Sequence, residues 1–330
     1  MKNLLYINLA LLLLIACGEP NKKQTSQKKS TPKKQITIPD FNADTAYLFV
    51  EKQVAFGPRV PNTVEHNNCA QFLYNKLKVY ADTALIQNYK TRAYNNTVLN
   101  GKNIIGSFKP HNINRILLCA HWDTRPYADY DKNPDNHLKP IDGANDAGSG
   151  VGVLLEIARQ MSLRNPGIGV DIIFFDVEDY GPPQELQMHG SNFWGLGSQY
   201  WSRNPHEPGY DARYGILLDM VGATNATFLM EGHSMLYASD ILKKVWTVGN
   251  RIGYTDFFLF DSAGYIDDDH KYVNEILGIP TIDIIHLDTE STGSIFFEHW
   301  HTLGDTMDKI DKETLKAVGQ TLLTVIYEEK

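Results

Sequence analysis

The stretch Arg115-Ile-Leu-Leu-Cys-Ala-His-Trp-Asp123 decides which fold this chain is expected to adopt. Residues 116–120 form a continuous apolar run, which is typical of a strand buried on both faces of a sheet. His121 and Asp123 follow that run, and side chains two positions apart in an extended chain point to the same side. A ring nitrogen and a carboxylate therefore face one pocket at the carboxyl end of a strand, where open α/β sheets bind ligands.

A second motif, Gly143-Ala-Asn-Asp146, precedes a predicted helix over residues 147–162. Apolar residues recur there at the spacing of one helix face, namely Val151, Leu154, Leu155 and Ala158. Asp146 is therefore expected at or near the helix N-cap. A carboxylate at that position commonly caps the helix, so capping and ligand binding are both open as roles of Asp146.

Predicted strands alternate with predicted helices along the rest of the chain. Strands are expected at residues 85–93, 102–108, 115–120, 170–175, 214–218, 227–231 and 281–285. Helices are expected at residues 43–55, 64–80, 147–162, 198–203 and 239–251, with a last helix capped by Asp311. This alternation predicts a single α/β domain with a central mixed, mostly parallel twisted sheet flanked by helices. The polar residues 124–142 form a long loop, and long ordered loops are often functional.

The composition suits one large domain and argues against nucleic-acid binding. The chain has 330 residues, of which 42% are hydrophobic, so it can bury a large core. The net charge of the whole chain is −8. Residues 1–36 hold seven lysines and one glutamate, a net charge of +6, so the net charge of residues 37–330 is −14. A body this acidic repels a phosphate backbone.

The first 36 residues are expected to be an export signal and a tether. Lys2 precedes an apolar run at residues 4–16 that is too short to span a bilayer. The sequence Leu14-Ile-Ala-Cys17 resembles the lipobox of bacterial lipoproteins, and a plain secretory signal with an incidental cysteine is the alternative. We expect a signal peptide at 1–17, a disordered tether at 18–36 and a folded domain at 37–330. The implied location is the bacterial cell envelope, lipid-anchored to a membrane through Cys17, on the periplasmic side or the cell surface.

Two further cysteines, Cys69 and Cys119, lie in the body of the chain. Cys69 lies in an amphipathic pattern and Cys119 in the buried strand, so both are expected to pack as small apolar residues. A disulfide between them is the alternative in an oxidising compartment.

Acidic residues and histidines follow the ends of several predicted strands. They are His121, Asp123, Glu178, Asp179, Asp219 and Asp268, and Asp146 and His301 complete the set. Carboxylates that converge on one sheet edge repel one another unless a cation or shared protons compensate. Carboxylate oxygens and imidazole nitrogens together are typical zinc ligands, so the pattern favours a zinc site.

The order of these motifs resembles that of the zinc-dependent exopeptidase superfamily. The motifs are His-x-Asp at 121–123, Gly-Ala-Asn-Asp at 143–146, Phe-Phe-Asp-x-Glu-Asp at 174–179, Leu-Asp at 218–219, Asp-Asp-His at 268–270 and Trp-His-Thr at 300–302. Within the superfamily the chain is most similar to the glutaminyl cyclases of animal and bacterial type, over about residues 43–327. The resemblance implies a zinc exopeptidase-like fold for residues 37–330.

The resemblance also implies a set of metal ligands. Asp146, Asp179 and His301 take the ligand positions for one zinc ion per chain. Animal cyclases have Glu where this chain has Asp179, so the shorter arm requires a closer approach of the backbone. His121 belongs to a second metal site or to a hydrogen-bond network, and Asp123 is expected to orient it.

Catalytic and substrate-binding residues follow from the same resemblance. Glu178 takes the place of the general acid/base, and Asp219 and Asp268 match two carboxylates beside the substrate amine. Adjacent residues of an extended segment point apart, so Glu178 and Asp179 serve one site only if the chain bends there. The expected aromatic walls are Trp300, Phe296, Phe297 and Trp194, although the loop that holds Trp194 departs from the animal pattern.

The implied activity is cyclisation of N-terminal glutamine of peptides and proteins to pyroglutamate, with release of ammonia. A zinc aminopeptidase that uses the same ligands to activate water is the main alternative. A non-catalytic binding ectodomain is a third hypothesis, which the filled ligand positions and Glu178 disfavour. The expected partners are peptides or proteins that begin with glutamine, and a membrane through Cys17.

Overall fold

The structure is a computed structural model that describes residues 37–186, 188, 193–288 and 294–330. The chain divides into a unit Met1–Gln35, which lies outside these residues, and a compact unit Ile36–Lys330. The expected signal peptide, lipobox cysteine and tether therefore lie outside the described residues.

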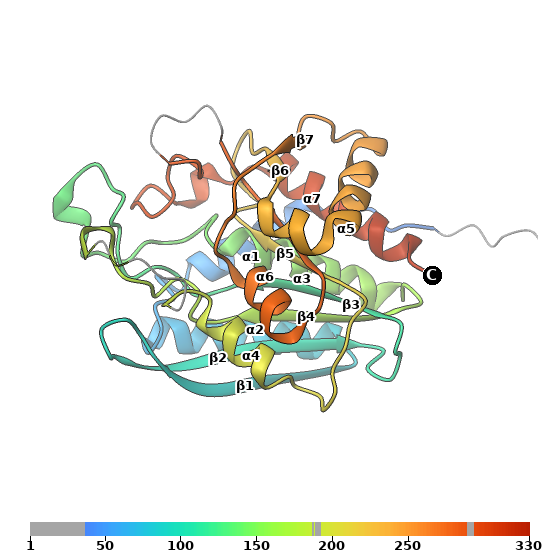
Figure 1. Cartoon of the computed structure of the whole chain (residues 1–330), viewed down its shortest axis with the longest axis horizontal. Helices are drawn as coiled ribbons and strands as arrows, with labels where there is room; N and C mark the ends of the chain where they lie inside the picture. Colours follow the sequence, from blue (N-terminus) through green and yellow to red (C-terminus); the bar gives the residue numbers. More distant parts are fainter. Residues whose placement is uncertain (1–36, 187, 189–192, 289–293) are drawn as a thin grey trace, which may run out of the picture. The chain divides into compact units, whose positions relative to one another are not determined.

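A six-stranded mixed sheet forms the centre of the described body (Figure 1). Its strand order is β1 (Thr83–Arg92), β2 (Val98–Phe108), β4 (Gly169–Phe175), β3 (Arg115–His121), β5 (Gly215–Asp219) and β8 (Thr281–Ile285). Strand β3 pairs in parallel with both β4 and β5, and β5 pairs in parallel with β8. Strands β1 and β2, and β2 and β4, pair antiparallel. The predicted α/β fold with a mixed, mostly parallel sheet is confirmed.

Helices cover both faces of this sheet. One core contains α1 (Ala43–Val54), α2 (Val64–Tyr80), α3 (Gly148–Leu163), α5 (Gly232–Arg251) and α7 (Lys312–Glu328). The opposite face carries α4 (Leu196–Arg203) and the short α6 (Asp269–Tyr272), which face the viewer in Figure 1. Alternate residues of β3 serve the two cores: Ile116 and Leu118 pack on the first, Leu117 and Cys119 on the second. A strand with both faces buried has to be apolar throughout, which explains the run at residues 116–120.

Two elements differ from the sequence-based expectation. Strand β6 (Phe228–Met230) forms a separate two-stranded sheet with β7 (Phe258–Ser262), with an isolated bridge from Phe228 to His286, and β7 was not predicted. Most of β7 is partly or fully exposed, so it lacks the apolar run of a buried strand. Helix α5 begins at Gly232, and its backbone is non-helical at Ala238 (φ −144°), so the helix expected at 239–251 corresponds to the part after this break.

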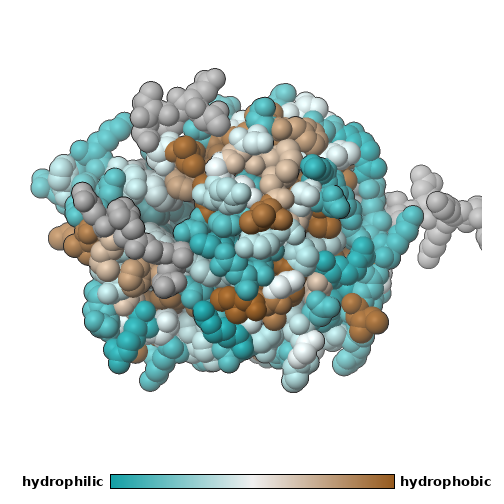
Figure 2. Space-filling view, viewed as in Figure 1, coloured by the Kyte–Doolittle hydropathy of each residue, from teal (hydrophilic) through white to brown (hydrophobic). Residues whose placement is uncertain are grey.

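Both cysteines of the body are free and buried, so they pack as the sequence predicted and form no disulfide. Within the described ranges no helix has the length and apolarity needed to cross a membrane. Figure 2 shows that the face bearing α4 and α6 is largely hydrophilic, with apolar residues in small separate patches. The apolar runs of the sequence are therefore used mainly in the two cores.

Candidate active site

The side chains expected to carry the chemistry meet at the carboxyl ends of the parallel strands, around a pocket of about 460 Å³. The lining includes Asp146, Glu178, Asp179, Trp194, Asp219, Asp268, Phe296, Trp300 and His301. His121, at the end of β3, lies just behind the lining, where it contacts two of these carboxylates. Parallel strands deliver their ends to the same edge of the sheet, so residues far apart in sequence share one site.

Asp146, Asp179 and His301 form a compact group of buried ligand side chains. The Nε2 atom of His301 lies 3.1 Å from Asp179 Oδ1 and 3.6 Å from Asp146 Oδ2. Asp179 Oδ2 is buried without a hydrogen-bond partner. Burial and the charge of Asp146 raise the pKa of Asp179 well above its usual range, and a bound cation would remove this penalty. Two carboxylates and an imidazole around one point fit a zinc ion.

The chain bends sharply between β4 and the two acidic residues that follow it. Val177 has φ 59°, a left-handed conformation that is uncommon for a β-branched residue. The carboxylate of Asp123 accepts the backbone N–H groups of Glu178 and Asp179, at 3.0 and 3.2 Å. This bend allows both neighbouring side chains to line the same pocket. Asp123 also lies 3.6 Å from Nδ1 of His121, so it contacts the residue that it was expected to orient.

Asp146 does not cap the helix that follows it. The N-cap of α3 is Ala147, which makes no side-chain capping bond, and the peptide bond between Asp146 and Ala147 is cis. The carboxylate of Asp305 accepts the N–H groups of Asn145 and Asp146, at 2.8 and 3.0 Å. Asp146 is therefore held by its backbone, and its side chain is left free to face the other ligands.

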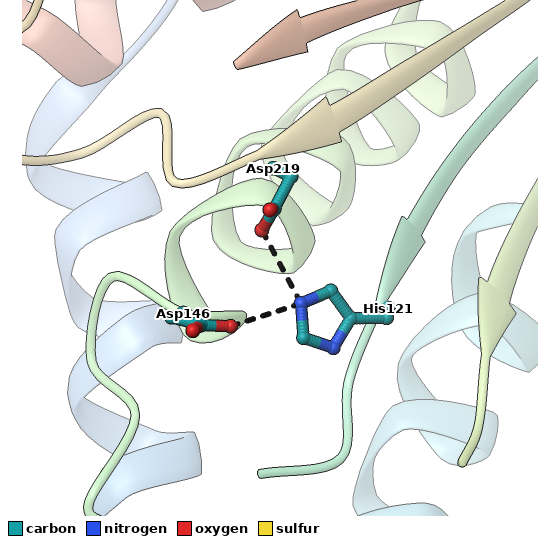
Figure 3. A group of neighbouring side chains, drawn as sticks. All are labelled: His121, Asp146 and Asp219. Carbon is teal, nitrogen blue, oxygen red and sulfur yellow. Dashed lines mark hydrogen bonds and ion pairs between the residues drawn. The ribbon is translucent and has the colours of Figure 1, made fainter. Parts of the chain in front are cut away.

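His121 connects the metal-ligand group to a further carboxylate (Figure 3). Its Nε2 atom lies 3.1 Å from Asp146 Oδ1 and 3.2 Å from Asp219 Oδ1. These three residues could also hold an ion, because their ligand atoms lie within 4.8 Å of one another. The geometry thus accommodates both roles predicted for His121.

Three acids that are not ligands of the first group lie beside it. Burial raises the pKa of Glu178 well above its usual range, and the charges of Asp179 and Asp268 add to this rise. Burial also raises the pKa of Asp219 to about 7, and it raises the pKa of Asp268. Acids with raised pKa values can hold and exchange protons near neutral pH.

Aromatic side chains form part of the pocket wall. Trp300 stacks on His301, with ring centroids 3.7 Å apart and planes at 22°, and Phe296 lies 4.5 Å from Trp300. Trp194 lies parallel to the His301 ring at 6.4 Å. Phe297 differs from the expectation, since it is 6% exposed and packs in a core cluster instead of lining the pocket. Adjacent side chains in an extended segment point apart, so only one of the two phenylalanines reaches the pocket.

Several residues of the site were not singled out from the sequence. Arg125 and Asp129, from the polar loop at 124–142, line the pocket and form a buried ion pair. Arg59 is fully buried and donates to the carbonyls of Asp142 and Gly143, which lead into the Asp146 motif. Asp305 supports Asp146 as described above. The length of the polar loop was a signal for function, but composition alone did not separate its buried residues from its solvated ones.

Comparisons with known proteins show the family of the chain. Residues 103–326 match the family described as peptidase family M28. The solved structure of Bacteroides thetaiotaomicron glutaminyl cyclase bound to N-acetylhistamine is 54% identical, with a TM-score of 0.87, and the match covers 89% of this chain and 100% of that one.

Two curated relatives carry different activities in their names. Glutaminyl-peptide cyclotransferase of Bos taurus is 26% identical over 255 residues, which cover 68% of this chain and 65% of the relative. Aminopeptidase YwaD of Bacillus subtilis (strain 168) is 28% identical over 250 residues, which cover 72% of this chain and 46% of the relative. The chain thus spans about half of the one curated relative and about two thirds of the other.

Proposed function

The chain belongs to peptidase family M28, and we propose that it is a zinc-dependent glutaminyl-peptide cyclotransferase. It converts the N-terminal glutamine of peptides or proteins to pyroglutamate and releases ammonia. The glutaminyl cyclases of known structure support this assignment, since one of them matches over its full length at 54% identity.

The observation that carries the proposal is the group of three acids beside the metal ligands. Glu178, Asp219 and Asp268 all line the pocket and all have raised pKa values. Crowded acids of this kind keep at least one shared proton near neutral pH. Such a group suits a reaction in which an amine gives up a proton and an amide nitrogen gains one.

Each residue of the site has a separate role in ring closure. The free α-amine attacks the carbon of the side-chain amide, a ring C–N bond forms, and the bond to the leaving nitrogen breaks. Glu178 takes a proton from the amine and passes it to the leaving nitrogen. Asp219 and Asp268 hold the amine in line, since orientation contributes most of the acceleration in an intramolecular reaction. Asp146, Asp179 and His301 would hold the zinc ion, which would supply Lewis acidity at the amide carbonyl.

The zinc aminopeptidase remains the second candidate because of the similarity to aminopeptidase YwaD and because of one feature of the site. His121, Asp146 and Asp219 form a second group whose ligand atoms lie within 4.8 Å, and two-metal sites activate water for hydrolysis. We propose that one zinc is bound and that His121 hydrogen-bonds within the acid network, because attack by an amine needs no metal-bound hydroxide. Metal analysis that finds two tightly held zinc ions per chain would favour the aminopeptidase.

The decisive experiment incubates the purified, zinc-loaded protein with matched peptides that begin with Gln, Leu or Ala. The cyclase predicts the loss of one ammonia from the Gln peptide alone, as seen by mass spectrometry. Release of free N-terminal amino acids without ammonia loss would assign the chain to the aminopeptidases.

We also propose that the enzyme is a lipoprotein of the bacterial cell envelope. The support comes from the sequence Leu14-Ile-Ala-Cys17 and from the polar, lysine-rich residues 18–36 that separate this cysteine from the folded body. An anchor of this kind would place the pocket near a membrane surface, within reach of exported peptides and proteins.

A further inference from the structure

A buried ion pair in the polar loop contacts two of the three proposed zinc ligands. We propose that Arg125 and Asp129 are positioning residues of the zinc site: Arg125 fixes the carboxylate of Asp179, and Asp129 holds Arg125 and places a negative charge beside the ring of His301. This inference rests on the ligand set of the proposed function and adds two residues to the machinery that tunes metal affinity.

The guanidinium of Arg125 donates hydrogen bonds to two carboxylates. Its Nε and Nη2 atoms donate to the two oxygens of Asp129, both at 2.7 Å, and its Nη1 atom donates to Asp179 Oδ1 at 3.3 Å. Both partners and the arginine are at most 1% exposed. The contact is to Oδ1 of Asp179, the oxygen that lies 3.1 Å from Nε2 of His301, and Oδ2 is buried without a hydrogen-bond partner among the described residues.

The same arginine also fixes the backbone that carries Asp179. Its Nη1 atom donates to the carbonyl of Asp179 at 3.3 Å, and its Nη2 atom donates to the carbonyl of Pro182 at 3.2 Å. Trp194 covers the guanidinium, with its ring 5.0 Å away. The short side chain of an aspartate has little freedom to adjust its reach, so its backbone must be held in place. The geometry of Arg125 supplies that restraint.

Asp129 reaches the third ligand from the other side. Its Oδ1 atom lies 3.8 Å from Nδ1 of His301, whose Nε2 atom faces Asp146 and Asp179. This is an electrostatic contact, since among the described residues Nδ1 has no hydrogen-bond partner. The N–H of Tyr130 donates to the carbonyl of His301 at 3.1 Å, which ties the loop to the ligand's backbone. A carboxylate beside the ring nitrogen that faces away from the metal holds the imidazole in orientation and raises its basicity.

The formal charges of the group also match a divalent cation. Asp146, Asp179 and Asp129 bring three negative charges and Arg125 brings one positive charge, which leaves −2 for the group. One Zn²⁺ neutralises this charge. Without Arg125 the three carboxylates would carry −3, so a bound Zn²⁺ would leave a buried charge of −1, and unpaired buried charges are costly.

The test measures zinc affinity by competition with a chelator in the full chain and in four variants. R125M removes the guanidinium and its hydrogen bonds to Asp129 and Asp179. R125K keeps the positive charge without the bidentate geometry of the guanidinium. D129N removes the negative charge beside His301. R125M, R125K and D129N are expected to bind zinc about 10- to 100-fold more weakly, which is the usual effect of losing a group that orients a ligand. R125K should lie between the wild type and R125M, because it retains the charge alone.

The matched control is R115K. Arg115 is also buried and pairs with Asp171 at 3.3 Å, but it stands at the start of β3, away from the pocket. The R115K variant should have a lower midpoint of thermal unfolding than the wild type in the metal-free state, and its zinc affinity should be unchanged. This comparison separates a general loss of stability from a specific effect on the metal ligands.

The outcomes are distinguishable. If R125M does not fold, R125K and D129N decide, and zinc affinities within twofold of the wild type in both would overturn the inference. If the unmutated chain binds zinc and fails to cyclise Gln peptides, the proposed activity is refuted. The positioning role is then still decided by the zinc affinities of R125M, R125K and D129N. Absence of zinc binding by the unmutated chain would refute both.

Discussion

Among single residues, Glu178 has the clearest consequence for catalysis. Replacement by glutamine keeps the size of the side chain but removes its ability to accept the amine proton. We expect E178Q to lower kcat on a Gln peptide by about 10²–10⁴-fold, the usual scale for a general acid/base. Zinc content should stay at the wild-type level, since the metal ligands are unchanged. Near-normal turnover would move the base elsewhere, with Asp268 as the next candidate.

His286 predicts a pH dependence of stability. It is 6% exposed, and burial lowers its pKa from 6.5 to about 4 in the folded chain. The unfolded chain therefore takes up the proton first as the pH falls, so stability is full above about pH 6.5 and is lost toward pH 4. At pH 5 the loss should be about 2 kcal/mol.

The measurement compares urea unfolding of the wild type and of H286Q at pH 7.5 and pH 5, in excess zinc. The difference in stability between the two pH values should be smaller in H286Q by that amount. Equal pH dependence in both proteins would show that His286 is not the titrating group. Other titrating groups cancel in the comparison, because both proteins share them.

Among the structural elements, the bend after β4 determines which side chains reach the pocket. One carboxylate, that of Asp123, accepts the N–H groups of Glu178 and Asp179. In D123N, one of the two side-chain positions becomes an N–H₂ donor that cannot accept from the backbone. We expect zinc affinity to fall about 10- to 100-fold, together with kcat.

The readouts for this variant are a chelator competition and the rate on a Gln peptide. The control is D256N, since Asp256 is exposed in the loop before β7 and should alter neither quantity. Unchanged zinc affinity in D123N would mean that the bend keeps its shape without this carboxylate. In that case the left-handed conformation of Val177 would have to be fixed by its own packing.

Element prediction succeeded where local sequence decides the structure. The strand Thr281–Ile285 and the N-cap at Asp311 agree with the expectation, because an apolar run and a capping carboxylate act within a few residues. Prediction failed for β7, which is largely exposed and pairs only with β6. Strand β7 depends on a partner distant in the sequence, so its own residues carry a weak signal.

The same distinction holds for the site. His121, Glu178, Asp179 and Asp219 lie at or just after strand ends, where strand order fixes the place of a side chain. Asp146, Asp268 and His301 lie outside strands and were placed by the family resemblance. Arg125 and Asp129 come from a loop whose path depends on the rest of the fold, and Arg125 meets Asp179 across 54 positions. Their burial was not encoded in local composition. The family resemblance did not supply them either, since it carried only the ligand and acid motifs.

For the whole molecule, the open question is where the pocket operates. The folded body carries the acidic charge and the chemistry, whereas residues 1–36 carry a net charge of +6 and the lipobox-like Leu14-Ile-Ala-Cys17. A single acyl chain gives only marginal membrane binding, so stable anchoring requires the multiple acylation that a lipoprotein cysteine receives. We expect the natural protein to carry acyl chains on Cys17 and to sediment with the membrane fraction.

The variant C17S, expressed from the full-length chain in a bacterium, tests this expectation. It should lose the acyl chains, as seen by mass analysis of the N-terminal peptide, and most of its membrane association. Activity on a Gln peptide should be retained, because Cys17 lies outside the compact unit Ile36–Lys330 that holds the pocket. The matched control S30A changes a residue of the tether and should leave the membrane fraction as in the wild type. An unchanged membrane fraction in C17S would show that lipidation at Cys17 does not anchor the protein.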